Sequence, residues 1–229
     1  MIEQTALKDR LFHGDSIRFM QRVPSGSVDL VVTDPPYLVN YKTREGKKAY
    51  KNDDPRRPEW LNEIFNELYR VLKPDAFCLS FYGYPRADAF LSAFRQAGFS
   101  MDGHFVWHKP YASSRGYTQR THEAAYLLTK GRPQKPHRPI PDVLPWGKYT
   151  GNRLHPCQKP VSVFRPIIEA FSKQGDLILD PFAGSASTAV AARELGRHYL
   201  AIELEWQYYQ RAWRRLHDEC VLSDKDAQS

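Results

Sequence analysis

Two short apolar strand candidates each end in an aspartate followed by proline, and this pattern constrains the fold more than any other feature. The first covers residues 28–33 and leads into the tetrapeptide D-P-P-Y at 34–37; the second covers 177–179 and leads into D-P at 180–181. Because proline cannot continue a central strand, each strand must stop where the polar residues begin. Both motifs are therefore predicted at strand ends of an α/β sheet, where such sheets place their ligands.

Amphipathic helices alternate with further strand candidates along most of the chain. In residues 59–72 the apolar side chains recur at helical spacing, and Lys73-Pro74 supplies a stop. Residues 104–108 and 124–129 are strand candidates with no helix between them, which favours an antiparallel edge. We therefore expect an α/β fold with a mixed, mostly parallel sheet. The other predicted segments are strands at 77–82 and 199–202 and helices at 86–97, 161–172, 188–195 and 205–216.

The composition is that of one globular domain. With 229 residues, 41% of them apolar, the chain can bury one sizeable core, so residues 1–229 are predicted to form a single domain. No apolar run approaches the roughly 20 residues that span a bilayer, and the first residues lack the features of a secretion signal. We expect a cytoplasmic protein without membrane association.

Cysteine and histidine usage predicts no metal site. The three cysteines include no C-x-x-C pair, which is typical of a reducing compartment. His155 and Cys157 lie two positions apart, but no second pair of ligands accompanies them.

The residues after the second strand have the composition of a nucleoside-binding turn. Residues 180–188 read DPFAGSAST between a strand and a helix, and Glu203 ends the next strand. Small residues allow close approach of the backbone, a helix N-terminus offers free N–H groups, and a carboxylate can accept hydrogen bonds from ribose hydroxyls. Plain packing also uses such turns, so the turn alone leaves both interpretations open.

The tetrapeptide after the first strand carries groups suited to an exocyclic amine. A carboxylate and a proline carbonyl supply acceptors for the two amine hydrogens, and a tyrosine can stack on an extracted base. Such hydrogen bonds localise the amine lone pair, which is otherwise conjugated with the ring, and so favour attack on a sulfonium methyl. A rigid turn capped by Asp34 is the structural alternative.

Taken together, the two motifs resemble those of the amino-methylating DNA methyltransferases. That family pairs D-P-P-Y with a D-P-F-x-G-S-G-T cofactor motif, and in this chain the tetrapeptide comes first, as in the circularly permuted β group. The resemblance implies a Rossmann-like methyltransferase fold, S-adenosylmethionine as cofactor and double-stranded DNA as substrate. Other matching pieces, spread over nearly the whole chain, are Gly14-Asp15, VWHKP at 106–110, THE at 121–123 and HPCQKP at 155–160.

The same resemblance assigns roles to individual residues. It implies that Glu203 holds the ribose, that Asp15 lies near the adenine and that Lys159 meets the carboxylate of the cofactor, although a solvated lysine before a helix is the plain alternative. Homodimers and cognate restriction endonucleases accompany many proteins of this kind. The implied catalytic residues are Asp34, Pro35, Pro36 and Tyr37. The implied cofactor-binding residues are Asp15, Asp34, Lys159, Asp180, Phe182, Ala183, Gly184, Ser185, Ser187 and Glu203.

The cofactor motif departs from the family pattern at two positions. Ala186 replaces its second glycine, and Ser187 replaces the following threonine. An extra methyl would matter if residue 186 needed a positive φ. We expect Ala186 to lie inside the start of the helix, where alanine is harmless.

Positive charge is concentrated between the two motifs. The chain has a net charge of +7 and a pI near 9.3, and residues 109–159 hold ten basic residues against two acidic ones. This favours contacts with phosphates. Residues 130–155, rich in proline and glycine, are predicted to form an extended surface segment rather than a packed layer, and are the candidate target-recognition segment. A second basic stretch at 42–57 is expected to close over an extruded nucleotide.

Three alternatives remain from the sequence. An N4-cytosine DNA methyltransferase faces the same chemical problem, and Asp34 in place of serine tips the resemblance toward adenine N6. RNA is also a polyanion, so basic charge alone does not separate it from DNA. From another functional class, a decayed methyltransferase fold that only binds DNA would be consistent with Ala186.

Overall fold

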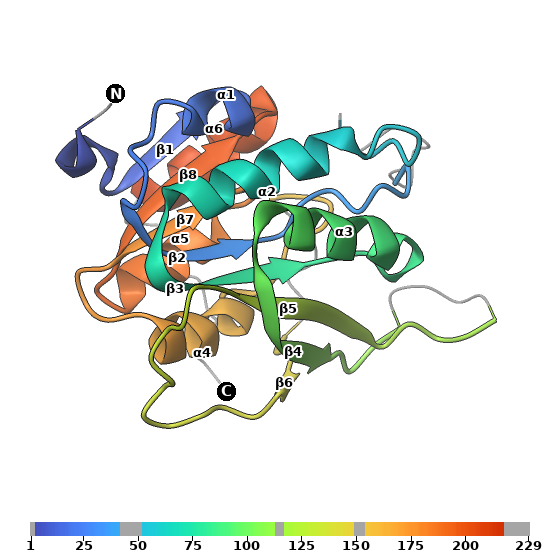
Figure 1. The fold of residues 1–229 in the computed structure, drawn as a ribbon. Helices are drawn as coiled ribbons and strands as arrows, with labels where there is room; N and C mark the ends of the chain where they lie inside the picture. The colour runs from blue at the N-terminus through green and yellow to red at the C-terminus, as the bar shows by residue number, and fades with distance from the viewer. Residues whose placement is uncertain (1–2, 42–51, 113–116, 149–153, 218–229) are drawn as a thin grey trace.

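One mixed sheet with helices on both faces organises the molecule (Figure 1). The computed structural model describes residues 3–41, 52–112, 117–148 and 154–217. The sheet has eight strands in the order β1-β8-β7-β2-β3-β5-β4-β6. Their bounds are β1 Arg10–His13, β2 Val28–Thr33, β3 Leu72–Phe81, β4 Ser100–His108, β5 His122–Lys130, β6 Val143–Pro145, β7 Leu177–Asp180 and β8 His198–Glu203.

The sheet is parallel from β1 through β3 and becomes antiparallel at β5. Strand β5 pairs antiparallel with both β3 and β4, as expected for two strands joined without a helix. The outermost pair differs from the expectation, because β6 runs parallel to β4. The predicted α/β class with a mixed, mostly parallel sheet is confirmed, and the antiparallel pairs lie one strand inside the edge.

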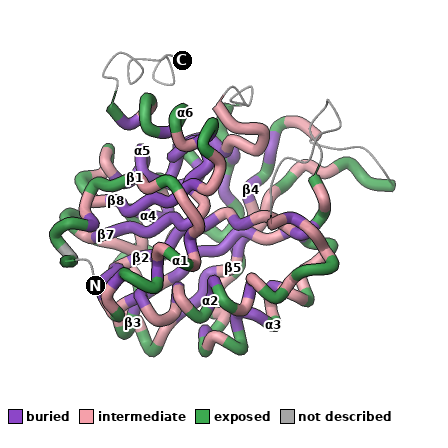
Figure 2. The backbone as a smooth tube through the Cα atoms, turned by 90° about the horizontal axis from the view of Figure 1, so that it is seen from above, coloured by how far each residue is buried: buried purple, intermediate pink, exposed green. Residues whose placement is uncertain are grey.

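The helices form two layers, and each layer seals its own apolar core against the sheet. Leu68 and Phe90 belong to the core on one face, and Phe164 and Val190 to the core on the other. Figure 2 shows the central strands as buried tube between these layers. One layer holds α1 Ser16–Met20, α2 Glu59–Val71 and α3 Ala87–Ala97; the other holds α4 Val161–Phe171, α5 Ser187–Glu194 and α6 Trp206–His217. Single 3-10 turns occur at Gln4–Leu7 (η1) and Tyr84–Arg86 (η2).

Helical periodicity predicted the long helices, but it did not identify the short elements. Helix α2 buries Leu61, Leu68 and their neighbours on one face, and α3 ends at Gly98 with a left-handed φ of 98°. The predicted stop at Lys73-Pro74 lies inside β3, because α2 ends at Val71 and β3 begins directly at Leu72. The pairing of β3 with β2 shifts register between Leu72 and Phe77, around Pro74. Strands β1 and β6 and helix α1 were not predicted, because three to five residues show no clear period.

The proline-rich segment is less exposed than its composition indicated. Strand β6 extends the sheet within it, and Leu144 and Trp146 are buried in the core on the α4 side. The expectation of a purely extended surface segment at 130–155 is therefore wrong for these residues. Backbone pairing of the Trp146 N–H with the carbonyl of His108 (3.0 Å) ties the segment to the end of β4.

No helix in the described ranges is long and apolar enough to cross a membrane.

Candidate active site

The carboxyl ends of the parallel strands gather four acidic residues at one rim of the sheet. Strands β2 and β7 are neighbours, with Val31 opposite Leu179, so Asp34 and Asp180 leave the sheet side by side. Glu203 ends β8, and Asp15 follows β1, the next strand outward. The fold thus brings together two motifs that are 146 positions apart in the numbering (Asp34 and Asp180).

Within the tetrapeptide, Tyr37 turns back onto Asp34. Its hydroxyl donates a hydrogen bond to Asp34 Oδ1 at 2.7 Å. Burial, followed by the negative charge of Asp34, raises the pKa of Tyr37 well above its usual value, so the ring stays a neutral phenol. Gly83, just beyond β3, lies so close that an added Cβ would meet Tyr37 Cβ at 2.6 Å. The end of β3 therefore fixes where this tyrosine sits.

The loop after the tetrapeptide is anchored by Asp53, a residue that sequence reasoning missed. Asp53 is 2% exposed, and its carboxylate accepts hydrogen bonds from the N–H groups of Val39 (2.9 Å) and Tyr41 (2.5 Å). An aspartate in the middle of a basic stretch was the available signal. The predicted closing segment at 42–57 lies partly outside the described residues, which leave out 42–51.

Lys159 lies at the Asp34 end of the candidate site. Its Nζ forms an ion pair with Asp34 Oδ2 and lies 4.5 Å from the centre of the Phe81 ring. The lysine is 7% exposed, so the alternative of a solvated lysine is wrong. Ser187 Oγ donates to the backbone carbonyl of Lys159 at 2.7 Å, which ties the lysine to the start of α5.

At the other end of the candidate site, Glu203 and Asp180 are buried carboxylates beside the turn at 180–188. Glu203 accepts hydrogen bonds from the backbone N–H of Gly184 (2.8 Å) and of Glu205 (2.8 Å). Asp180 accepts one from the N–H of Phe182 (3.1 Å). Burial raises the pKa of Asp180 to about 7 and that of Glu203 to about 7. Carboxylates with spare lone pairs at the ends of β7 and β8 fit a ligand that brings hydroxyl donors.

Asp15 has a structural task as well as a place at the rim. Its carboxylate caps α1 by accepting from the N–H of Arg18 at 3.0 Å. The next residue, Ser16, donates to the carbonyl of Pro181 at 2.5 Å. The start of α1 is thereby fixed against the cofactor turn, and Phe182 packs edge-on against Trp60 with ring centres 5.7 Å apart.

Ala186 adopts the conformation that a glycine would favour. It has φ 61° and ψ 29°, forms the N-cap of α5 and is 1% exposed. The expectation that Ala186 lies inside the helix start is wrong: the turn must reverse in the left-handed region immediately before the helix. Here alanine bears a strain that the family's glycine does not.

Ser185 and Ser187 are buried and face Arg215 of α6. Arg215 Nη1 donates to the Ser185 carbonyl (2.8 Å) and to Ser187 Oγ (3.0 Å). The arginine supports the turn from behind, and nothing in the sequence near either motif indicated it. Ala183 is buried in the same turn, with its N–H bound to the Ile202 carbonyl at 2.9 Å.

The segment before α4 packs on this turn, where an added Cβ at Gly184 would meet the His155 ring at 3.5 Å. Cys157 N–H donates to His155 Nδ1 at 3.3 Å, and the His155 ring lies edge-on to Tyr208 at 4.4 Å. Burial, with the positive charge of Lys159 next, lowers the pKa of His155 to about 3, so the ring is neutral. Among the described residues, no three histidine, cysteine or acidic side chains cluster as metal ligands would.

A second ion pair lies at the same rim, between the ends of β4 and β5. Lys109 Nζ is 2.7 Å from Glu123 Oε1, and Lys109 is 2% exposed. The motif pieces at 106–110 and 121–123 contain both residues, but sequence reasoning gave them no role. The lysine ammonium lies 5.6 Å from the Trp146 ring and 6.0 Å from the Tyr111 ring.

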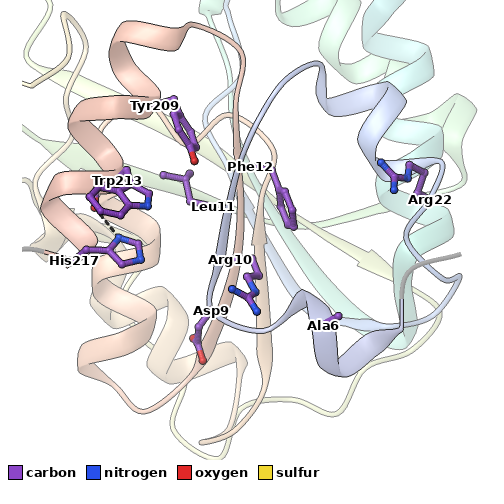
Figure 3. A pocket seen from close by; sticks show the side chains of 9 residues that line it. All are labelled: Ala6, Asp9, Arg10, Leu11, Phe12, Arg22, Tyr209, Trp213 and His217. Carbon is purple, nitrogen blue, oxygen red and sulfur yellow. Dashed lines mark hydrogen bonds between the residues drawn. The ribbon is translucent and has the colours of Figure 1, made fainter.

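A surface pocket among the described residues lies elsewhere. Its lining residues, among them Arg10, Phe12, Arg22 and Trp213, lie between edge strand β1 and α6 (Figure 3). The pocket has a volume of about 600 Å³. None of the predicted catalytic or cofactor-binding residues lines it. The chemistry-bearing groups converge at the strand ends instead, and we place the candidate site there.

Comparison with known proteins agrees with this geometry. The family model described as DNA methylase, of the N6/N4 type, matches residues 28–214. The protein named "Putative methylase YubD", from Escherichia coli (strain K12), is 48% identical over 90% of this chain and 89% of its own length. The protein named DNA adenine methyltransferase YhdJ, also from E. coli (strain K12), is 28% identical over 90% of this chain and 82% of its own length.

Solved structures show the same fold. The M1.HpyAVI complex with S-adenosylmethionine superposes with a TM-score of 0.72 at 22% identity, covering 91% of this chain and 98% of that one. The PvuII cytosine-N4-specific DNA methyltransferase gives 0.74 at 18% identity, covering 91% and 86%. The chain therefore belongs to the N6/N4 DNA methylase family, whose members transfer a methyl group from S-adenosylmethionine.

Proposed function

We propose that this DNA methyltransferase methylates N6 of an adenine flipped out of duplex DNA. The observation that carries the proposal is the paired arrangement of Asp34 and Tyr37, a carboxylate and a neutral phenol ring held together at the end of β2. Aspartate at this position favours adenine by the family resemblance, and the relative YhdJ is named as an adenine methyltransferase. An N4-cytosine target is the competing assignment, since PvuII shares the fold.

In the proposed reaction, Asp34 and the Pro35 carbonyl accept the two amine hydrogens and make the nitrogen lone pair available. The nitrogen–carbon bond forms as the sulfur–carbon bond breaks, and Asp34 takes the proton that the nitrogen then loses. Tyr37 stacks on the extruded base, which offsets part of the cost of extrusion. No covalent bond to the protein is formed.

The buried groups of the turn would hold the cofactor, which supplies the methyl group. Glu203 would accept from the ribose hydroxyls, Asp15 would lie near the adenine, and residues 182–187 would wrap the methionine end beside Asp180. Lys159, which pairs with Asp34 in the structure, would exchange this partner for the cofactor carboxylate and so release Asp34 for the amine of the base. Ala186, in the left-handed conformation, and the buried Ser187 form the start of α5. The free N–H groups at this helix N-terminus would be available to the cofactor.

One product analysis tests the assignment. The purified protein is incubated with unmethylated duplex DNA and isotope-labelled S-adenosylmethionine, the DNA is digested, and labelled nucleosides are identified by mass spectrometry. The proposal expects label in N6-methyladenine. Label in N4-methylcytosine would reassign the base, and cofactor binding without DNA labelling would direct the same experiment to RNA. Absence of cofactor binding would favour a DNA-binding protein that has lost catalysis.

Partners beyond DNA follow from the same proposal. A cognate restriction endonuclease accords with relatives such as M.HpaI of Haemophilus parainfluenzae, which is named a Type II methyltransferase. The homodimer is proposed from the family resemblance alone. Residues 130–155 remain our candidate for target recognition, with β6 fixing their middle to the sheet. We also take residues 1–229 as one methyltransferase domain, with the tetrapeptide before the cofactor motif as in the permuted β group.

A further inference from the structure

The Lys109–Glu123 ion pair lies beside the proposed base site and has no part in the reaction described so far. Lys109 is 2% exposed, whereas the side chain of Glu123 is 22% exposed. The carboxylate is therefore the member of the pair that a ligand can reach. The lysine is enclosed between β5 and the segment leading from β6, where the rings of Tyr111 and Trp146 flank it.

Stability alone does not account for a buried ion pair at this position. Desolvating two charges costs about as much as their attraction returns, and apolar side chains of similar volume often replace such pairs without loss. The pair also adjoins aromatic packing, since Trp107 precedes it in β4 and lies 4.9 Å from the Phe81 ring. Buried charges at the ligand-binding rim of a sheet point to a functional role.

Strand register places Glu123 across the site from Asp34. Phe81 in β3 pairs with Ala125 in β5, so Glu123 lies two residues farther toward the rim, level with Gly83. Gly83 is the residue against which Tyr37 packs. Strand β3 separates β2 from β5, and two interstrand spacings amount to about 10 Å, comparable with a nucleobase and its contacts.

The electrostatics of Tyr37 agree with this placement. After burial, the charges of Asp34 and then Glu123 are the next largest causes that raise the pKa of the phenol. Both carboxylates therefore lie within electrostatic reach of the ring on which the base would stack. They approach it from different strands, β2 and β5.

The two candidate bases differ most at the end of the Watson–Crick edge that is remote from the amine. In adenine that position is C2–H, a weakly positive group without lone pairs. In cytosine it is the O2 carbonyl oxygen, a strong acceptor. A carboxylate tolerates the first and repels the second, because two acceptors without a shared proton cannot form a hydrogen bond.

We infer that Glu123 is a specificity-determining residue that excludes cytosine from the base site, with Lys109 holding its carboxylate in place. This inference rests on the proposed adenine N6 activity. With the amine at Asp34, the carboxylate of Glu123 faces C2–H of adenine and would oppose O2 of cytosine. Replacing it with an amide supplies a donor for O2.

The test compares Glu123→Gln with the wild-type protein on the same unmethylated plasmid DNA, measuring N6-methyladenine and N4-methylcytosine in one digest. The ratio of the two products is independent of how much enzyme is folded. We expect the share of N4-methylcytosine to rise about tenfold or more in the variant, the effect of exchanging a repulsive contact for a hydrogen bond. The matched control is Glu194→Gln, because Glu194 also pairs with a cation, Arg165 at 2.7 Å, away from the rim.

The outcomes separate the inference from the function on which it rests. If the wild type makes N6-methyladenine and Glu123→Gln keeps the wild-type ratio, the specificity role is overturned and the proposed function stands. If the wild type makes N4-methylcytosine, both are overturned, since the carboxylate then coexists with cytosine. A rise in the ratio in Glu194→Gln as well would also count against a role at the site.

Should Glu123→Gln lose turnover on both bases, binding gives the same comparison. Duplexes with a mismatched adenine or a mismatched cytosine, whose extrusion costs least, are titrated in the presence of S-adenosylhomocysteine. The wild type is expected to prefer the adenine mismatch and the variant to lose that preference. An unchanged preference overturns the inference.

Discussion

At the scale of single residues, Asp34 has two partners in the described protein, the Tyr37 hydroxyl and the Lys159 ammonium. We therefore expect a substitution of Asp34 to change both turnover and the stability of this part of the sheet. Asp34→Ala should lower kcat by at least about 10²-fold, because the amine loses its acceptor in the transition state. Single-turnover kinetics with labelled cofactor measure this loss, and retained turnover would refute the mechanism.

The same substitution leaves the ammonium of Lys159, which is 7% exposed, without its carboxylate. We expect a loss of about 1–3 kcal/mol in the free energy of unfolding. Adding Lys159→Met should restore much of that stability without restoring turnover. A double variant that regained activity would show that Asp34 acts only by holding the lysine.

The raised pKa values of Asp180 and Glu203 make stability depend on pH. Both values are about 7, against usual values of 3.8 and 4.5, so between these limits the folded chain binds more protons than the unfolded chain. Stability supplied by these groups is therefore present at low pH and declines as the pH rises toward 7, by on the order of 1.4 kcal/mol per pH unit for each group. Urea denaturation from pH 5 to pH 8 measures the slope.

The control for this pH dependence is the doubly substituted Asp180→Asn, Glu203→Gln protein, which carries neither carboxyl group. Its free energy of unfolding should change less steeply over the same range. Equal slopes in the two proteins would mean that other groups cause the effect.

Substitutions of Ala186 test whether the turn before α5 requires a left-handed backbone conformation. Ala186→Gly removes a strain of about 1–2 kcal/mol but also a buried methyl group worth about 0.8 kcal/mol, so stability should change by less than about 1 kcal/mol. Ala186→Val should lose about 2 kcal/mol or more, since a β-branched residue fits this conformation poorly. Thermal denaturation compares the three proteins, and a stable valine variant would contradict the assigned geometry.

At the scale of elements, the site is a junction between strand ends. The loop after β2 packs on the end of β3 at Gly83, whose φ of −93° is accessible to any residue. A side chain at this position would collide with Tyr37, because an added Cβ would lie 2.6 Å from Tyr37 Cβ. Gly83→Ala should displace the tyrosine and lower kcat by about tenfold or more, because base stacking and the hydrogen bond to Asp34 both move. Steady-state kinetics measure kcat, and thermal denaturation of the same variant measures its stability.

Gly103→Ala is the matched control for this contact. Its added Cβ would meet Leu127 Cβ at 3.2 Å, at the β4–β5 pairing and away from the tetrapeptide. This variant should lose some stability and keep its kcat. If both glycine variants lost activity in proportion to stability, a specific role for Gly83 would be refuted.

At the scale of the whole molecule, the count of ten basic residues in 109–159 overstates the positive charge that this segment can offer to phosphates. Lys109 and Lys159 are buried in ion pairs at the rim. Lys130 ends the antiparallel strand β5 at the far side of the sheet, where Nζ donates to the carbonyls of Tyr69 and Leu72 at 2.6 Å each. These three lysines are already engaged within the protein, so we do not count them among the residues that contact phosphates.

Arg120 differs from them in its place in the fold. It precedes β5 on the rim side, and its guanidinium lies 4.6 Å from the ring of Tyr84, which is 68% exposed. Arg120→Ala should weaken DNA binding and reduce the slope of log K against log salt by about 1. Lys130→Met is the control and should leave the slope unchanged. If the wild type and both variants gave equal slopes, Arg120 would not contact a phosphate.

The sequence alone determined the α/β class, the long helices and the placement of two motifs at strand ends. These follow from local physics: proline stops a strand, helical spacing of apolar residues marks a buried face, and a carboxylate next to proline and tyrosine suits an exocyclic amine. Short elements such as β1 and β6 were missed because pairing with neighbouring strands, rather than their own pattern, stabilises them.

Only the tertiary structure decided which charges meet. Lys159 reaches Asp34 across 125 positions of sequence, Arg215 supports a turn 28 positions before it at Ser187, and Asp53 anchors the loop after the tetrapeptide. The strand register likewise placed Glu123 beside the proposed base site. Such contacts depend on strand order and burial, which set the distance between the groups and the cost of desolvating them, and neither quantity is written in the spacing of residues along the chain.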